Sequence, residues 1–262
     1  MCSSAHVHSS IGSADHMDTS DHIDSLESDG RLLAEAAAGG DLDAGVPSCP
    51  EWKLRELVGH IGSVQRWATR FVADGLTEPG RIDTGEVPEG TAIVDWFGAG
   101  HGDLVAALRA ADPALECWTF LEAPSPLAFW ARRQAHETAI HRVDGELAAG
   151  LPVTPFPADF AADGLDELLV GFFGFQRLDG ERGGDGIITV RPDDAGVGWL
   201  ADLNGGDERA RGPEPVEGAC ELRGPASDLY VLLWNRLSLD NTAAGVEGDS
   251  SLLDTWRATR AF

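Results

Sequence analysis

The amino-acid sequence predicts an α+β fold in which an N-terminal antiparallel four-helix bundle precedes a small α+β domain. Up to residue 149, long segments place apolar residues at three- and four-residue spacing, which is typical of amphipathic helices. Gly150 and Pro152 interrupt this pattern, and short alternating stretches separated by glycines follow, which favours strands. We therefore expect a bundle over residues 21–152 and a second domain over residues 157–262, after a disordered tail at residues 1–20.

The helices of the bundle are expected at about residues 23–38, 53–73, 91–110 and 127–149. The second shows the clearest apolar face, formed by Leu54, Leu57, Val58, Ile61, Val64 and Ala68. The third carries three glycines, each of which costs about 1 kcal/mol relative to alanine in a helix. Helices joined in sequence by loops pack naturally as an antiparallel bundle.

The second domain is expected to combine helices with short strands. Its helices are predicted at about residues 158–176, 228–237 and 252–260, and its strands at residues 187–190, 197–200 and 218–222. The tail before the bundle is rich in serine, histidine and aspartate, and Met17 is a plausible start of translation. Its histidines could chelate metal weakly, although solvated side chains are the simpler interpretation: His6, His8, His16 and His22.

Composition limits the partners. A net charge of −25 repels phosphate backbones and anionic membrane surfaces, so we expect neither nucleic acid nor membrane as a partner. Small anionic substrates would need a local cluster of arginines. The four cysteines are scattered, which fits free thiols in a reducing cytoplasm, and neither a signal peptide nor a membrane span is apparent. The sequence therefore predicts a soluble cytoplasmic protein.

One helix carries residues suited to a metal site. Glu137 and His141 lie four residues apart, so they project from one face, about 40° apart around the axis. His136 lies about 100° from Glu137 and points elsewhere. His60, beside the apolar face of the second helix, is the best third ligand. Two histidines and one carboxylate leave a coordination position open for water or substrate. A surface Glu–His pair and a half-buried His60 are the simpler alternatives.

Several ordered blocks of sequence carry a family resemblance. VPSCPEWKLRELVGH at residues 46–60, WTF at 118–120 and FWARRQAHETAIHRVD at 129–144 resemble the signatures of the mycothiol-dependent maleylpyruvate isomerase family, a branch of the DinB-like metal-binding bundles. GPASDL at 224–229 and LLWNR at 232–236, with the stretch from Gly248 to Trp256, are similar to the family's sterol-carrier-like second domain.

The resemblance implies particular site residues. Its metal ligands correspond to His60, Glu137 and His141, and the metal is usually zinc. Its second-domain arginine, thought to face the active site across the domain interface, corresponds to Arg236. One departure is Lys53, where a threonine or serine would complete a capping box with the acidic residue three positions later.

The resemblance also implies a reaction in which mycothiol is the thiol cosubstrate. A divalent metal, expected to be zinc, would deprotonate the thiol, whose ordinary pKa is about 8.5. Addition to a cis double bond, rotation and elimination would then give the trans product of a maleylpyruvate-like substrate. Arg236 is the first choice to meet the substrate carboxylate or the enolate.

Two further residues are assigned to the cofactor-binding part of the site. Arg133 lies one turn before Glu137 and is the second choice for the substrate carboxylate, with a structural or surface ion pair as the alternative. Asp144 lies three residues after His141 and would orient its imidazole, with a helix-end salt bridge as the alternative.

Other functions fit the same residues. A mycothiol S-transferase would leave the thiol on an electrophile instead of releasing it. An Fe(II) oxygenase also uses two histidines and a carboxylate, although the bundle and the family resemblance argue against it. A non-catalytic, metal-stabilised binding module is a further class. The expected partners are a small-molecule substrate and a thiol, and the chain would act as a monomer or homodimer.

Overall fold

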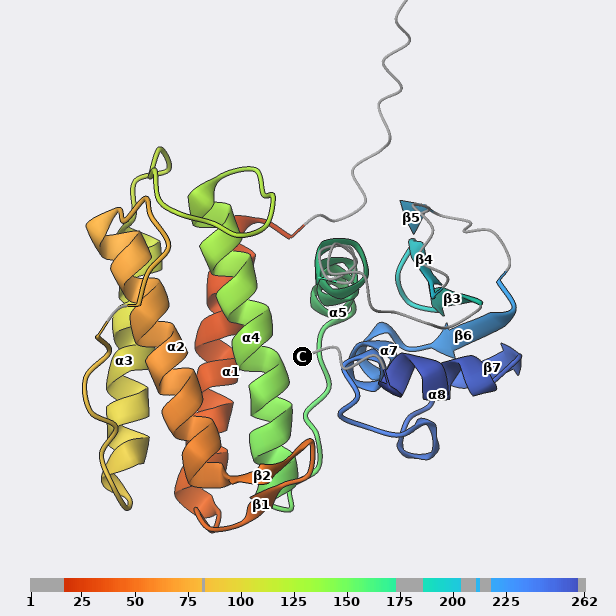
Figure 1. The fold of residues 1–262 in the computed structure, drawn as a ribbon, viewed down its shortest axis with the longest axis horizontal. Coiled ribbons are helices and arrows are strands. Elements are labelled where there is room, and N and C mark those ends of the chain that lie inside the picture. The colour runs from red at the N-terminus through yellow and green to blue at the C-terminus, as the bar shows by residue number, and fades with distance from the viewer. Residues whose placement is uncertain (1–16, 82, 173–185, 204–210, 213–217, 259–262) are drawn as a thin grey trace, which may run out of the picture.

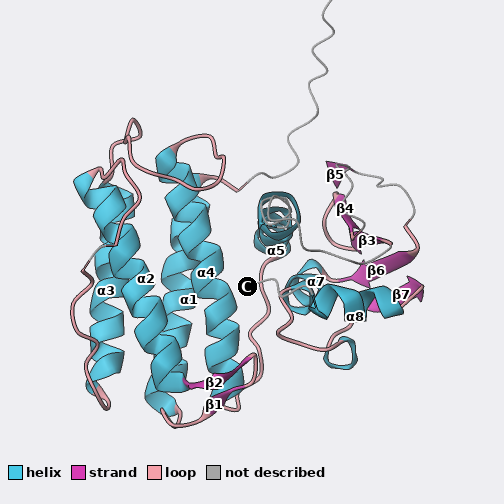
Figure 2. Cartoon of the chain, viewed as in Figure 1, coloured by secondary structure: helices cyan, strands magenta, loops and turns pink. Residues whose placement is uncertain are grey.

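The computed structural model describes residues 17–81, 83–172, 186–203, 211–212 and 218–258, and it confirms the predicted α+β fold. Four long helices stand side by side, and a smaller unit of helices and strands packs beside them (Figures 1 and 2). The bundle helices are α1 (Thr19–Gly39), α2 (Leu54–Asp74), α3 (Ala92–Ala110) and α4 (Pro126–Ala148). None of the described helices is long and apolar enough to span a membrane.

The first helix begins earlier than the sequence predicted. The Asp18 side chain accepts hydrogen bonds from the backbone N–H groups of Ser20 (2.7 Å) and Asp21 (2.9 Å). The Asp21 carboxylate accepts one in return from the backbone of Asp18 at 2.9 Å, which completes a capping box. Thr19 and Ser20 therefore belong to the bundle and not to a disordered tail.

His22 also corrects the prediction of solvated tail histidines. It lies in the first turns of α1 with only 5% of its surface exposed. Its Nε2 lies 3.0 Å from Asp163 Oδ1 of the second domain. The other three tail histidines and residues 1–16 lie outside the described part of the chain.

A short hairpin that the sequence did not predict leads into α2. It consists of β1 (Gly45–Val46) and β2 (Cys49–Lys53), paired antiparallel. At the helix start, the backbone N–H of Lys53 donates to Glu56 Oε2 at 2.8 Å. The Lys53 side chain cannot accept a hydrogen bond, and its Nζ instead pairs with Asp43 at 2.7 Å. The capping box is thus only half formed, as its sequence suggested.

The helices pack through the apolar faces that their periodicity predicted. Leu54, Leu57 and Ile61 of α2 are fully buried, whereas Val64 is only half-buried because it lines a pocket. The glycines do not interrupt α3. Gly100 leaves space for the Arg66 guanidinium, which a Cβ at this position would approach to 2.2 Å and force to move.

The described part of the second domain joins short helical segments to one sheet. α5 (Ala158–Asp166) continues as the π-helix η1 (Glu167–Phe172), and α7 (Ala226–Leu233), the 3₁₀-helix η3 (Leu239–Asn241) and α8 (Ser251–Ala258) follow later. The described strands have the order β5-β4-β3-β6-β7. Their bounds are β3 Ile187–Pro192, β4 Gly198–Asp202, β5 Arg211–Gly212, β6 Cys220–Gly224 and β7 Gly245–Gly248. β3 pairs antiparallel with β4 and parallel with β6.

Several predicted bounds shift. The helix predicted at 158–176 changes to π geometry at Glu167, and residues 173–176 and 259–260 lie outside the described part. The helix predicted at 228–237 ends at Leu233, because Asn235 adopts a left-handed φ of +61° that an α-helix does not accommodate. This turn places Arg236 against α4.

The two domains share one hydrophobic core. It runs from Trp130 of α4 through Phe156 and Phe160 to Tyr230 of α7. Polar contacts cross the same junction: the backbone N–H of Phe156 donates to Ser227 Oγ at 3.0 Å. The second domain is therefore held firmly against α4, the helix that carries two of the expected metal ligands.

Candidate metal centre

The three expected metal ligands meet between α2 and α4. His60 Nε2 lies 3.8 Å from Glu137 Oε1, and His141 Nε2 lies 3.6 Å from the same oxygen. The imidazole rings of His60 and His141 are 5.4 Å apart between centroids. Each of the three residues offers a ligand atom within 4.8 Å of the other two.

These separations fit a tetrahedral cation. Bonds of about 2.0–2.1 Å, as zinc forms with nitrogen and oxygen, place tetrahedral ligand atoms about 3.3 Å apart. The observed 3.6 and 3.8 Å would need only a small contraction. All three side chains are partly exposed to a pocket, so a fourth position is accessible to a small molecule. Two imidazoles and a carboxylate are also the donor set of known catalytic zinc sites.

Asp144 orients His141. The Nδ1 of His141 lies 2.8 Å from Asp144 Oδ2, and an ionised carboxylate can only accept, so Nδ1–H is the donor. Burial lowers the pKa of His141, but Asp144 and Glu137 outweigh it and raise the pKa to about 9, so Nε2 carries a proton toward Glu137 that a bound cation would replace. The hydroxyl of Ser48, from the hairpin turn, also donates to Asp144.

Arg236 reaches the same carboxylate from the second domain. Its Nε donates to Asp144 Oδ1 at 3.0 Å and its Nη2 to Asp144 Oδ2 at 3.1 Å, which is a bidentate pair. Only 6% of the Arg236 side chain is exposed and none of Asp144. The structure thus brings Arg236 to the site across the domain interface, with part of its guanidinium engaged by Asp144.

Arg133 occupies the opposite side of the ligand group. Its Nη2 donates to Glu137 Oε2 at 2.9 Å, and its Nη1 donates to Glu167 at the start of the π-helix. The guanidinium lies 4.8 Å from the ring centroid of Phe172. Arg133 is buried and forms an internal ion pair with the second carboxylate oxygen of Glu137. It also lines the aromatic pocket described below.

The carboxylates of the site differ in protonation. Burial raises the pKa of Glu137, but hydrogen bonds from His141 and His60 and the charge of Arg133 outweigh it and hold the pKa well below its usual range. Asp144 behaves similarly, with a pKa lowered to about 2 by His141 and Arg236 in spite of burial. For Glu167, burial dominates over the nearby guanidinium of Arg133 and raises the pKa to about 7.

An aromatic pocket of about 480 Å³ opens onto the ligand group. Its walls combine α2, α4 and the second domain, with aromatic side chains from Trp52, Trp67, Phe120, Phe172 and Trp234. Gln134 also lines it, with 2% of its surface exposed. The Gln134 Oε1 atom is buried and has no hydrogen-bond partner among the described residues. An unpaired buried carbonyl oxygen is costly, and its place in the lining makes Gln134 a candidate contact for a bound ligand.

A second group of potential ligands has a different geometry. His22 and His136 place their Nε2 atoms 3.0 and 2.8 Å from Asp163 Oδ1. Arg132 donates to the same oxygen at 2.7 Å. These are hydrogen-bond lengths, and the carboxylate is already neutralised by a guanidinium. We interpret this group as a buried polar network that joins the domains.

Sequence reasoning missed three residues of the site. Gln134 precedes Glu137 by three positions and His141 by seven, so helical spacing alone could have placed it on the ligand face. Glu167 and Ser48 gave no comparable signal. One depends on a π-turn and the other on an irregular hairpin, and neither follows from periodicity.

Comparison with known proteins identifies the family. The family sequence model named mycothiol maleylpyruvate isomerase N-terminal domain matches residues 24–145, and the one named MDMPI C-terminal domain matches residues 159–255. Two solved structures, a mycothiol-dependent maleylpyruvate isomerase and a histidine-to-alanine mutant of it, are 12% and 11% identical to this chain, with TM-scores of 0.58 and 0.60. Each comparison covers 87% of this chain and 93% of the other, and at this identity it shows a shared fold.

Comparison with curated proteins gives no significant match. The two family matches, however, follow one another along the chain and together span most of it. The chain therefore belongs to the mycothiol maleylpyruvate isomerase family.

Proposed function

We propose that this protein is a divalent-metal enzyme that uses mycothiol to isomerise a maleylpyruvate-like dicarboxylate from cis to trans. The observation that carries the proposal is that His60, Glu137 and His141, all of which line the aromatic pocket, place one ligand atom each within 4.8 Å of the other two. Membership of the family and the printed names of the similar structures support mycothiol as the cosubstrate.

Each ligand residue has a defined task. His60, Glu137 and His141 would hold the cation, for which zinc fits the donor set best. A bound divalent cation supplies acidity, because it lowers the pKa of a coordinated thiol into the neutral range. Asp144 keeps the Nδ1 proton on His141 and so presents Nε2. Arg133 fixes the orientation of the Glu137 carboxylate.

Two arginines and one amide side chain would bind the substrate. The chain as a whole repels anions, yet Arg133 and Arg236 both line the aromatic pocket. They would stabilise a substrate carboxylate and the negative charge that develops on thiol addition. The Gln134 amide would make a hydrogen bond there, which is consistent with the lack of an internal partner for its Oε1 atom.

A mycothiol S-transferase is the second candidate. It is favoured by the aromatic lining of the pocket, which suits an apolar electrophile. It is also favoured by the carboxylates that already face both guanidiniums, Glu137 and Glu167 for Arg133 and Asp144 for Arg236. The two functions differ in the fate of the thiol, which an isomerase returns unchanged.

Turnover measurements test the proposal. Zinc-loaded protein is mixed with mycothiol and maleylpyruvate, and both the trans product and the remaining free thiol are quantified. We expect trans product at constant thiol, and loss of activity by at least a hundredfold in Glu137→Gln. The control is His136→Gln, whose side chain is adjacent in sequence but faces the domain junction.

Three other results would contradict the isomerase. Loss of thiol into a stable conjugate indicates the S-transferase. Absence of turnover with any thiol, while metal removal merely lowers the melting temperature, indicates a binding module. Activity that depends on iron and oxygen indicates an oxygenase.

A further inference from the structure

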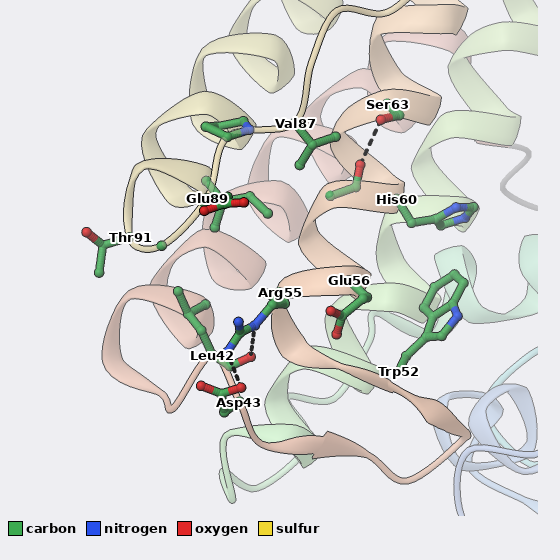
Figure 3. A pocket seen from close by; sticks show the side chains of 14 residues that line it. Leu42, Asp43, Trp52, Arg55, Glu56, His60, Ser63, Val87, Glu89 and Thr91 are labelled. Carbon is green, nitrogen blue, oxygen red and sulfur yellow. Dashed lines mark hydrogen bonds and ion pairs between the residues drawn. The ribbon is translucent and has the colours of Figure 1, made fainter.

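A second, larger pocket adjoins the metal ligands on their other side. It has a volume of about 1020 Å³ and lies between α2, the end of the β1–β2 hairpin and the segment that leads into α3. Figure 3 shows Trp52 and His60 at one side of it and Leu42, Asp43, Glu89 and Thr91 at the other. Trp52 and His60 line both pockets, so a ligand passing these two side chains would extend from one to the other.

The lining of this pocket combines apolar side chains with an excess of acidic ones. Three carboxylates, of Asp43, Glu56 and Glu89, stand against one guanidinium, of Arg55. Arg55 is itself paired with Asp43, and its Nε donates to the carbonyl of Leu42 at 3.4 Å. The pocket therefore repels an anion, whereas the aromatic pocket contains two arginines.

Hydroxyl groups complete the lining. Ser63 and Thr91 belong to the lining, and the Ser63 hydroxyl, which donates to the carbonyl of Gly59 at 2.9 Å, can still accept a hydrogen bond. Trp52 contributes a half-buried indole whose ring lies 4.9 Å from that of His60. Carboxylates and hydroxyls accept and donate to the many O–H groups of a polyol. An indole face can cover the apolar face of a sugar ring.

The volumes of the two pockets suggest that the substrate and the bulky part of the thiol cosubstrate bind in different pockets. Pockets for one drug-sized ligand measure about 300–1,000 Å³. At about 480 Å³, the aromatic pocket has room for one small molecule beside the metal ligands. A thiol cosubstrate that carries a sugar and a cyclitol would need separate space, and the larger pocket offers it.

We propose that the pocket lined by Ser63, Glu89 and Thr91 is the subsite for the neutral, polyhydroxylated part of the thiol cosubstrate. The amino-sugar and inositol rings of mycothiol would lie there, with the chain to sulfur passing Trp52 and His60. The anionic substrate is left to the aromatic pocket with Arg133 and Arg236. This inference rests on the proposed function, because it assumes the thiol.

Binding of the sulfur-free pseudodisaccharide, glucosaminyl-inositol, tests the subsite directly. Isothermal titration calorimetry measures its dissociation constant for the full-length zinc-loaded protein, so turnover is not needed. Ser63→Leu fills the pocket, and Glu89→Ala removes a carboxylate from it. We expect the dissociation constant to rise at least tenfold in Ser63→Leu and severalfold in Glu89→Ala.

Matched controls exist on the same elements. Thr69, like Ser63, is a half-buried hydroxyl residue of α2 that donates to a carbonyl four residues earlier, and it lines neither pocket. Glu86 is an exposed glutamate in the same segment as Glu89 and lies outside the pocket lining. Thr69→Leu and Glu86→Ala should bind the pseudodisaccharide as the wild type does.

Kinetics provide a second readout. In Ser63→Leu, the KM for mycothiol should rise at least tenfold more than the KM for N-acetylcysteine, which lacks the rings. Wild-type protein that does not bind the pseudodisaccharide, or equal binding by Ser63→Leu, overturns the subsite. Binding that is lost in Ser63→Leu supports the subsite even if no isomerase activity is found, so the two proposals fail separately.

Discussion

At the scale of residues, Asp144 connects the parts of the site. One of its oxygens accepts from His141, and its two oxygens together hold the guanidinium of Arg236. It is completely buried, so its charge is stabilised only by these partners and by Ser48. The position of the metal ligand and that of the second-domain arginine therefore depend on one carboxylate.

We expect Asp144→Asn to weaken zinc binding about 10–100-fold, because loss of a carboxylate behind a ligating imidazole typically has an effect of this size. Competition with a chromophoric chelator measures the affinity. Glu146→Gln is the control, since Glu146 is another buried carboxylate of α4, paired with Arg142 at 2.8 Å away from the site. Equal zinc affinity in Asp144→Asn and wild type would show that the imidazole needs no such support.

Gln134 allows function to be separated from stability. Because its amide oxygen has no internal partner, Gln134→Leu should not lower the melting temperature, while kcat/KM for the dicarboxylate should fall about tenfold, as for one lost hydrogen bond. In contrast, Gln65→Leu removes the bond that Gln65 Nε2 donates to Thr138 at 2.9 Å, outside either pocket. It should destabilise the protein and leave kcat/KM intact. Unchanged kinetics in Gln134→Leu would exclude a substrate contact.

At the scale of elements, α1, α4, α5 and α7 meet in one buried polar network. Burial lowers the pKa of His136 to about 4, in spite of the opposing effect of Asp163. His136 also contacts the Tyr230 hydroxyl at 3.0 Å, and the charges around it come from Arg132 and His22. The neutral imidazole is thus part of the packing between the domains.

The sign of the resulting pH dependence follows from the lowered pKa. Between pH 6.5 and 4 the unfolded state binds a proton at His136 that the folded state does not, so stability falls as the pH falls. The contribution is about 3 kcal/mol over this window. Urea unfolding at pH 7 and pH 5 should show a smaller loss in His136→Gln than in wild type. An identical pH dependence in both proteins would refute a neutral buried His136.

The elements also show what the sequence could and could not predict. The helices of the bundle were predictable because their apolar periodicity is long, and His60 flanks such a face, where the structure brings it near Glu137. The two- and four-residue strands β5 and β7 are too short to leave a pattern. The π-helix begins at Glu167, whose carboxylate pairs with Arg133 of α4, and no local signal in the sequence reveals either feature.

At the scale of the whole molecule, the acidic charge opposes the substrate. With a net charge of −25, the chain repels a dicarboxylate at long range, whereas Arg133 and Arg236 in the aromatic pocket attract it locally. The larger pocket, lined by Ser63, Glu89 and Thr91, and the aromatic pocket thus differ in charge, although both are lined by Trp52 and His60.

Salt should therefore improve the encounter with the anionic substrate. Raising the ionic strength from about 0.01 to 0.15 M shortens the screening length from about 30 to 8 Å. We expect the KM for the dicarboxylate to fall severalfold over this range, while the KM for an uncharged electrophile stays constant. A rise in KM with salt would mean that local attraction by the arginines outweighs the global charge.

Metal content tests the central claim most directly. Protein expressed in zinc-supplemented medium is gel-filtered and analysed by inductively coupled plasma mass spectrometry, and circular dichroism verifies the fold of each variant. We expect one zinc per chain in wild type and in His136→Gln, and less than one tenth of that in His141→Ala. A full equivalent of zinc in folded His141→Ala, or its loss in folded His136→Gln, would contradict a site formed by His60, Glu137 and His141.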